Sequence, residues 1–247
     1  MARDDLNSPV EIPTQVRRVV SLVPSLTESV AATAPQLLVG ATNWCPASLD
    51  VVRVGGTKNP AAARIVELAP DVVLANEEEN RTSDLDELRA AGLAVWVTRV
   101  RTVEEAFSSL DRMLSLACRL DRPAWLDRAQ RSWADVRAGA DRTAVIPIWR
   151  RPWMVLGRDT FAGDALARLG VHNGFADADE RYPRVRLDEL HATELVVLPD
   201  EPYPFGPTDG PECFPGQHVA LVSGRHLTWY GPSLVEAPEV LSRQLAG

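Results

Sequence analysis

The residues best suited to chemistry lie in irregular segments that follow predicted strands, where open α/β sheets usually hold their ligands. Tryptophans stand in these segments at positions 44, 149, 153 and 229. Aromatic rings in polar loops suit a flat or bulky ligand. Alternatively, the rings plug the ends of the loops. The segments are 25–28, 43–45, 55–60 and 76–81 in the first half, and 149–153, 158–160, 181–183, 200–205 and 228–231 in the second.

Charged residues in the same segments admit two interpretations each. The 26 basic residues include one lysine, Lys58, which favours a function or a close packing role for it. The acidic run 77–79 is either a solvated turn or a rim that meets cations. Arg150 and Arg151 either form ion pairs with that run or hold an anionic group bidentately.

Common catalytic and metal-binding motifs are absent from the sequence. It contains no P-loop, no Gly-x-Gly-x-x-Gly after a strand, no Gly-x-Ser-x-Gly and no His-Glu-x-x-His. All four histidines lie in the second half, so we expect no metal site shared between the halves. The cysteines at 45, 118 and 213 are widely spaced, which predicts reduced thiols rather than a disulfide or a structural zinc site.

Short apolar runs alternate with amphipathic segments along the whole chain, and this rhythm must position the loops. Such runs occupy 18–23, 39–42, 71–75 and 94–97, and then 144–148, 195–198 and 219–222. The pattern predicts an α/β fold with short parallel sheets covered by helices on both faces.

One helix is expected to join the two halves. The segment from Asp121 and Pro123 to about position 138 contains no internal breaker. At 1.5 Å per residue its ~16–18 residues span ~25 Å, about the width of a small lobe. We therefore expect two Rossmann-like lobes: an N-terminal α/β lobe at 1–120, a bridging backbone helix at 121–140 and a C-terminal α/β lobe at 141–247.

Composition excludes several classes of function. Among 247 residues, 26 are basic and 34 acidic, and the net charge of −8 leaves no basic surface for nucleic acid. No apolar run approaches the ~20 residues of a spanning helix, so we expect no membrane insertion. The first ten residues carry two aspartates and no apolar stretch, which predicts a cytoplasmic protein unless a leader precedes the chain.

Several motifs resemble the periplasmic-binding family for cobalamin and ferric-siderophore uptake, whose soluble relatives are helical-backbone metal receptors. In the first half these are RVVSLVPSLTE (18–28), VGGTKNP (54–60), IVELAPDVVLA (65–75) and EENR (78–81). In the second half they are IWRRPWM (148–154), DT (159–160), YP (182–183), LPDEPYPF (198–205) and WYG (229–231). The resemblance spans about 17–243 and implies two α/β lobes with the ligand in the cleft between them.

The resemblance also implies which residues contact that ligand. They lie in the family's cleft loops, and by position they are Ser25, Thr27, Trp44, Cys45, Thr57, Lys58, Asn59, Glu78, Asn80, Arg81, Arg150, Arg151, Trp153, Tyr182, Trp229 and Tyr230.

The sequence departs from the family at three places. No export signal is visible in the chain. The glutamate that docks the first lobe on a membrane permease falls at Ala63, and its second-lobe counterpart falls near Asp188. The helix expected after 195–198 is replaced by the proline-rich stretch 201–216. We therefore expect no delivery of cargo to a permease.

These observations predict a non-enzymatic, two-lobed binding protein without an intrinsic cofactor. Its ligand is expected to be a corrinoid (cobalamin-like) or another bulky metal chelate such as an iron chelate, bound with limited closure because the bridging helix resists hinge motion. One alternative is a cytosolic enzyme on the same architecture, with Asp159, Glu201 or Glu78 as acid–base groups. Another is a protein-interaction module whose cleft is vestigial.

Overall fold

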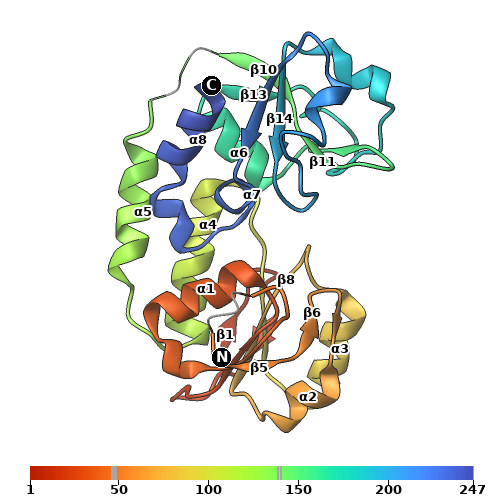
Figure 1. Ribbon diagram of the computed structural model, residues 1–247. Helices are drawn as coiled ribbons and strands as arrows, with labels where there is room; N and C mark the ends of the chain where they lie inside the picture. The colour runs from red at the N-terminus through yellow and green to blue at the C-terminus, as the bar shows by residue number, and fades with distance from the viewer. Residues whose placement is uncertain (46–48, 138, 140, 247) are drawn as a thin grey trace. The chain divides into compact units, whose positions relative to one another are not determined.

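The computed structural model describes residues 1–45, 49–137, 139 and 141–246, except for the side chains at 191 and 192. The chain divides into two compact units, each of which is built from segments distant in sequence (Figure 1). Unit 1 comprises Met1–Arg99, Glu105–Asp127 and Tyr230–Pro232, and unit 2 comprises Val100–Glu104, Arg128–Trp229 and Ser233–Gly247.

A five-stranded parallel sheet forms the centre of unit 1. Its order is β5 (Val52–Arg53), β4 (Leu38–Ala41), β3 (Val19–Ser21), β8 (Val72–Asn76) and β9 (Val95–Thr98). β3, β8 and β9 are buried along their whole length, as expected for parallel strands with both faces covered. The chain reverses its direction of advance between β3 and β8, so the topological switch point of this sheet lies there.

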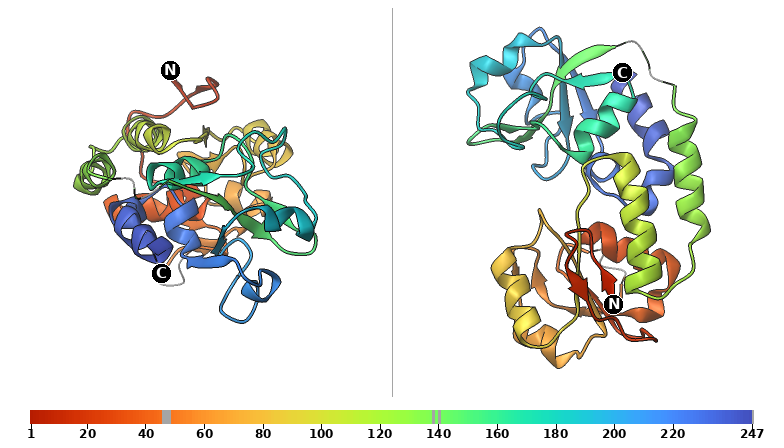
Figure 2. Two further views of the ribbon diagram at one scale, coloured as in Figure 1. Left: turned by 90° about the horizontal axis from the view of Figure 1, so that it is seen from above. Right: turned by 180° about the vertical axis from the view of Figure 1, so that it is seen from behind.

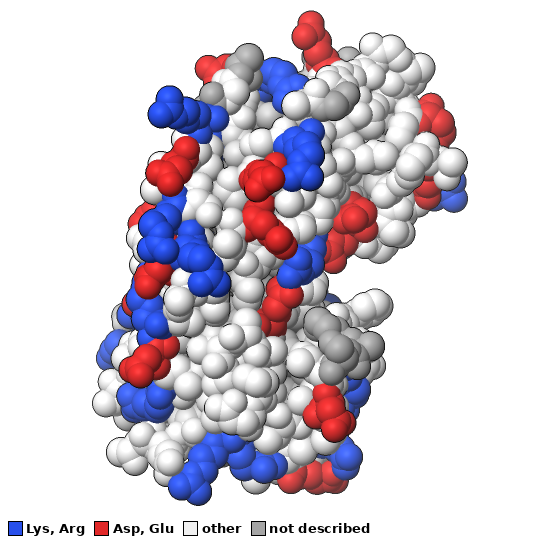
Figure 3. Space-filling view, turned by 60° about the vertical axis from the view of Figure 1, so that its left-hand side comes forward, with Lys and Arg blue, Asp and Glu red and all other residues white. Residues whose placement is uncertain are grey.

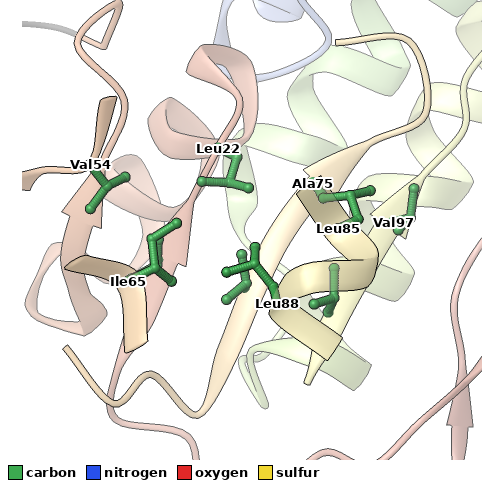
Figure 4. Packing of buried hydrophobic residues seen from close by; sticks show 10 residues of the cluster. Leu22, Val54, Ile65, Ala75, Leu85, Leu88 and Val97 are labelled. Carbon is green, nitrogen blue, oxygen red and sulfur yellow. The ribbon is translucent and has the colours of Figure 1, made fainter. Parts of the chain in front are cut away.

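Helices cover both faces of this sheet. α2 (Ala62–Glu67) and α3 (Thr82–Ala90) lie on one face, and α1 (Pro24–Thr33) and α4 (Val103–Arg112) lie on the other (Figure 2). α4 continues into a π-helical turn at Met113–Ala117. Ile65 of α2 and Leu85 and Leu88 of α3 pack against valines of the strands in one hydrophobic cluster (Figure 4).

The first ten residues are an integral part of unit 1. They form a hairpin of β1 (Ala2–Arg3) and β2 (Pro9–Val10). The buried Asp4 accepts hydrogen bonds from the backbone N–H of Ser8 at 2.8 Å and of Leu6 at 3.0 Å. The backbone N–H of Asp5 donates to Val97 in β9 at 3.1 Å. The two aspartates therefore serve to attach this segment to the sheet.

Unit 2 contains a four-stranded parallel sheet in the order β13 (Val171–Asn173), β10 (Arg142–Val145), β14 (Leu195–Pro199) and β15 (His218–Val222). Its switch point lies between β10 and β14. A hairpin of β11 (Pro147–Trp149) and β12 (Met154–Val155) extends from β10. The helices of the unit are α6 (Phe161–Arg168), α7 (Gly224–Thr228) and α8 (Ala237–Ala246), with single helical turns at Leu187–Ala192 and Pro211–Cys213.

The expected bridging helix is shorter than 121–140. α5 runs over Ala124–Ala134, and the division between the units falls inside it, after Asp127. Arg122 lies before the helix, where it pairs with Asp111 at 2.7 Å and with Asp127 at 2.6 Å. Residues 135–137 have left the helix, and positions 138 and 140 lie outside the described residues. The expected lobe boundaries stay a prediction.

The surface mixes charges of both signs. Basic and acidic side chains are interspersed over the face drawn in Figure 3. Neighbouring opposite charges account for part of this pattern, as in the exposed pair of Arg243 and Glu239 on α8, 2.9 Å apart. Within the described ranges, no helix combines the length and the hydrophobicity that crossing a membrane requires.

The packing of α3 on the sheet gives a first prediction. Leu88 is fully buried in the cluster of Figure 4, so Leu88→Ala should lower the free energy of unfolding by about 2–5 kcal/mol. Val66 on α2 is 42% exposed, and Val66→Ala should change it by less than about 0.5 kcal/mol. Urea unfolding of both variants measures the difference, and equal effects would contradict this packing.

Candidate ligand-binding site

The carboxyl ends of the strands in unit 1 carry most of the predicted first-half residues. Because parallel strands end at one edge, the loops after β3, β4 and β8 meet there. Thr27 and Cys45 lie inside this edge rather than on it. The Cys45 thiol donates to Thr27 Oγ1 at 3.1 Å, and Thr27 Oγ1 donates to the carbonyl of Val23 at 2.9 Å. Both are buried, and their hydrogen bonds fix the loop at this edge.

Trp44, next to Cys45, is the most exposed large aromatic residue of this edge. Its side chain is 72% exposed. A Cβ atom on Gly56 would lie 3.7 Å from Trp44 Nε1 and 2.5 Å from Asn59 Oδ1. The missing side chain of Gly56 therefore brings the indole and the carboxamide together beside the hairpin of β6 (Gly55–Gly56) and β7 (Asn59–Pro60). Asn59 belongs to this hairpin and not to a helix, which begins at Ala62.

Two asparagines hold the loop after β8. Asn76 Oδ1 accepts from the backbone N–H of Glu78 at 2.8 Å and of Glu79 at 3.2 Å. Asn80 Oδ1 accepts from the N–H of Asn76 at 2.8 Å, and Asn80 Nδ2 donates to the carbonyl of Thr57 at 2.8 Å. The loop after β8 is thereby joined to the turn between β6 and β7.

Lys58 strengthens this joint. Its ammonium group donates to the backbone carbonyl of Glu78. The structure thus brings Thr57, Lys58, Glu78 and Asn80 together through bonds to one another, and their contact with a ligand stays a prediction. Arg81 follows at the start of α3 and is exposed.

Ser25 and Tyr230 lie at the covered part of the same edge. Ser25 in the first turn of α1 is 2% exposed, and its Oγ has no hydrogen-bond partner among the described residues. Tyr230 belongs to unit 1 and is buried beside Thr98 and Asn76, so desolvation raises its pKa well above the usual range. A Cβ atom on Gly231 would lie 2.9 Å from the carbonyl of Ser25. Tyr230 and Gly231 therefore cross this edge from the end of β9 to α1.

In unit 2, Arg150 is committed to its own unit. It pairs with Asp209 and, at 2.7 Å, with Glu212 Oε1, and its side chain is 14% exposed. Tyr203 donates its hydroxyl to Asp209 Oδ2 at 2.7 Å. Arg150 also lies over the ring of Trp153, 5.6 Å from its centroid. It therefore pairs with Asp209 and Glu212, neither of which belongs to the 77–79 run considered as its partner.

Trp153 is likewise built into a packed cluster. Its ring stacks on Phe205, with centroids 6.1 Å apart, and meets Phe214 edge-on at 5.7 Å. These phenylalanines come from the proline-rich stretch 201–216, which the sequence left without regular structure. Residues of this stretch pack against Arg150 and Trp153.

Arg151 and Tyr182 are more accessible. Arg151 is exposed and adopts a left-handed backbone conformation, with φ of 72°. Tyr182 is half-buried, with Arg181 over its ring at 5.5 Å. It lines an open hollow of about 650 Å³ together with Met154, Asp179, Glu180, Pro183 and Arg184.

Trp229 lies at the carboxyl edge of unit 2 beside a carboxylate that the predicted ligand contacts did not include. Its half-buried ring has Arg225 5.8 Å from the centroid, and it hydrogen-bonds the side chain of Glu201. Glu201 was considered only as an acid–base group. The signal that could have found it as a contact is its position two residues after a buried strand, in an Asp-Glu-Pro turn.

The described residues contain no group of three or more histidines, cysteines, aspartates or glutamates arranged to hold a metal ion.

No family model matches the chain, but comparisons with known proteins identify relatives of it. The chain is 23% identical over 196 residues to the vitamin B12-binding protein of Vibrio cholerae serotype O1, covering 75% of this chain and 71% of that one. The solved periplasmic vitamin B12 binding protein of Vibrio cholerae superposes with a TM-score of 0.76 at 18% identity, over 95% of this chain and 98% of that chain. A periplasmic heme-binding protein in complex with two hemes gives a TM-score of 0.73 at 22% identity, over 93% and 97%.

These matches confirm the expected α/β architecture and the resemblance to the helical-backbone metal receptors. They also overturn the cytoplasmic assignment, because the matched proteins are periplasmic, which points to the periplasm instead. The assignment failed because it rested on the acidic start of the chain. Asp4 and Asp5 are bonded into unit 1, so their charge reflects folding and carries no information about export.

The ion pairs of Arg150 give a second prediction. Hydrogen bonding from Arg150 lowers the pKa of Glu212 from 4.5 to about 2. A carboxyl group with a lowered folded-state pKa contributes stability above its unfolded pKa and loses it as the pH falls through the folded value. In Arg150→Gln the pKa of Glu212 should return toward 4.5, and the stability difference from wild type should shrink between pH 4.5 and 2.

An NMR pH titration of the glutamate side chains measures this pKa, and unfolding at each pH measures the stability. Arg243→Gln is the control, because Arg243 pairs only with exposed Glu239 among the contacts described. A Glu212 pKa that stays near 2 in Arg150→Gln would show that Arg150 is not its cause.

Proposed function

We propose that this protein is a non-enzymatic binding protein for a bulky metal chelate, with a corrinoid of the vitamin B12 type as its ligand. The observation that carries the proposal is the match over most of the chain to proteins named for binding vitamin B12 or heme. Both ligands are flat, metal-containing macrocycles. Each unit, taken by itself, offers polar loops and an aromatic ring at the carboxyl edge of its sheet, and these are the chelate contacts that we propose.

The exposed indole of Trp44 supports this function on physical grounds. A tryptophan that is 72% exposed leaves a large apolar face in water. Burying that face under a macrocycle gains about 25 cal/mol per Å² of apolar area, and offset stacking adds to it. The indole stands beside Asn59 and the Gly55–Gly56 turn, so a ligand seated on it also meets a free carboxamide edge.

Catalysis by the same loops is the rival function, and one observation favours it. Burial and the neighbouring Asp200 raise the pKa of Glu201, as in many acid–base residues. The other carboxylate considered in this unit, Asp159, is 69% exposed and only 3.7 Å from Arg158, so it lacks a comparable environment. Incubation with cobalamin, followed by mass spectrometry of the released ligand, separates the two: unchanged ligand supports binding alone.

Docking on a membrane permease is a separate question from ligand binding. Ala63 lies exposed on α2, where the docking carboxylate is expected, while Glu67 on the same helix is 64% exposed and pairs with Arg64 at 3.0 Å. Asp188 is held by Arg186 at 2.7 Å. A lone exposed ion pair contributes about 1 kcal/mol or less, so we propose that this chain does not dock through paired carboxylates.

The stacking role of Trp44 gives a third prediction. Trp44→Ala should weaken cobalamin binding by about 5- to 150-fold, equivalent to about 1–3 kcal/mol, because the ligand loses its aromatic platform. Quenching of intrinsic tryptophan fluorescence on titration with cyanocobalamin measures the affinity.

Trp44→Phe is the matched control, since it keeps an aromatic face at the same place and should retain most of the affinity. Equal affinity of all three proteins would contradict the stacking role. No binding of cobalamin or of heme by the wild-type protein at high micromolar concentration would contradict the proposed function itself.

A further inference from the structure

Glu201 occupies the ligand-binding edge of unit 2. It stands two residues after β14, which is the strand beside the switch point of the sheet. Open α/β sheets bind their ligands outside the carboxyl ends of strands at such points. The side chain is half-buried and hydrogen-bonded by Trp229, one of the predicted ligand contacts.

The backbone around Glu201 is built to hold this side chain. A Cβ atom on Gly224 would lie 2.3 Å from Glu201 Cγ and 2.9 Å from its carbonyl oxygen, so only glycine permits the approach. The neighbouring Asp200 accepts from the backbone N–H of Gly224 at 2.6 Å, which fixes the turn that carries both acidic residues. Glu201 is therefore placed by close packing at the first turn of α7.

One oxygen of the Glu201 carboxylate has no hydrogen-bond partner among the described residues. This oxygen, Oε1, is buried. Arg225, the nearby cation, is directed to the ring of Trp229 and lies 3.7 Å from Glu236. A buried acceptor without a donor is unfavourable, and a donor supplied by a ligand removes that cost. The residue as a whole is half-buried, so a ligand seated on this edge can contact it.

We infer that Glu201 is a specificity-determining residue that selects chelates presenting hydrogen-bond donors, such as the carboxamide groups of a corrinoid, over chelates presenting carboxylates. The inference rests on the proposed function. A carboxamide N–H donates to Glu201 directly. The propionate groups of heme are anionic, and they meet repulsion from Glu201 and from Asp200 beside it. The same loop therefore attracts one class of macrocycle and repels the other.

The protonation of Glu201 makes this selectivity dependent on pH. Burial and Asp200 raise its pKa, while Arg225 and the Trp229 hydrogen bond act in the opposite direction. His226 and Glu236 are the other titratable groups that adjoin Arg225 here. As the pH rises through the raised pKa, Glu201 becomes an anion, and discrimination against carboxylate-bearing ligands should increase.

The test compares the affinities of the full-length wild-type protein and Glu201→Gln for cyanocobalamin and for iron(III) protoporphyrin, from pH 4.5, the ordinary pKa of a glutamate, to pH 8. We expect the wild type to prefer cobalamin, and the ratio of affinities to fall by about tenfold or more in the variant. Heme binding by the variant should strengthen, because glutamine can donate to a propionate. The ratio should rise with pH in the wild type and stay flat in the variant, since the titration of the ligands themselves is common to both proteins.

Two further variants keep the result interpretable. Glu239→Gln removes an exposed carboxylate of the same unit, on α8, and should leave the ratio unchanged. Glu201→Asp keeps the charge and should retain the preference even if its absolute affinity falls. Circular dichroism melting of each variant verifies that it is folded, and if Glu201→Gln does not fold, loss of the preference in Glu201→Asp overturns the inference.

The outcomes separate the inference from the proposed function. If the wild type binds cobalamin and the ratio is the same in Glu201→Gln, the inference fails while the function stands. A wild type that prefers heme also overturns the inference. If the wild type binds neither probe, the proposed function fails, and the inference fails with it.

Discussion

The hydrogen bonds of the Asn76 and Asn80 carboxamides fix the loop at the carboxyl edge of unit 1. At the end of a buried parallel strand the backbone leaves the ladder, and its polar groups need new partners. Asn76 supplies such partners on two sides. Its Oδ1 accepts from the backbone N–H of Glu78 in the loop after β8, and its Nδ2 donates to the carbonyl of Thr98 in β9 at 3.0 Å. Asn80 then carries the connection to Thr57. This pair therefore joins the loop after β8 to β9 and to the turn between β6 and β7.

Unit 2 meets the same requirement with charge and aromatic packing. Arg150, in the β11–β12 hairpin, forms ion pairs with Asp209 and Glu212. These two residues lie about 60 residues later, in a stretch without long helices. Trp153 adds stacking on Phe205 from that stretch. The half-buried guanidinium of Arg150 has two carboxylate acceptors, so the hairpin and the proline-rich stretch stabilise one another. The edge of unit 2 is consequently acidic, with Asp200 and Glu201 following β14 directly.

Sequence patterns predicted the parts of the fold that depend on local chemistry. Strands such as β8 and β14 are continuous apolar runs, and the parallel sheets follow from their alternation with helices. The joining of Thr57 and Lys58 to Glu78 and Asn80 was also foreseeable, because all four follow strands that end at one edge. The whole set of sixteen predicted contacts stays a prediction, since no ligand contact has been observed.

Long-range partners could not be predicted in the same way. From sequence alone, an arginine in a loop is equally consistent with an anion-binding site and with an ion pair. Nothing near Arg150 in the sequence indicates that Asp209 is its partner. Tyr230 carries no local sign that it is buried beside Asn76, more than 150 residues earlier. The helix expected to reach position 138 ends at Ala134, because the absence of a breaker permits a helix without requiring one.

The two edges differ in polarity, and this difference bears on the kind of ligand that fits. In unit 1 the exposed groups at this edge include the Trp44 indole, the Asn59 carboxamide and the Glu77 carboxylate, and the Lys58 ammonium is already directed to a backbone carbonyl. In unit 2 the principal arginine is neutralised by two carboxylates, and the unsatisfied group is the carboxylate of Glu201. Arg81 and Arg151 lie near these edges and are exposed, so their guanidinium groups are less costly to leave in water than a buried arginine would be. For the proposed corrinoid this matters in unit 2, because its amide groups can donate where Glu201 is an acceptor to satisfy.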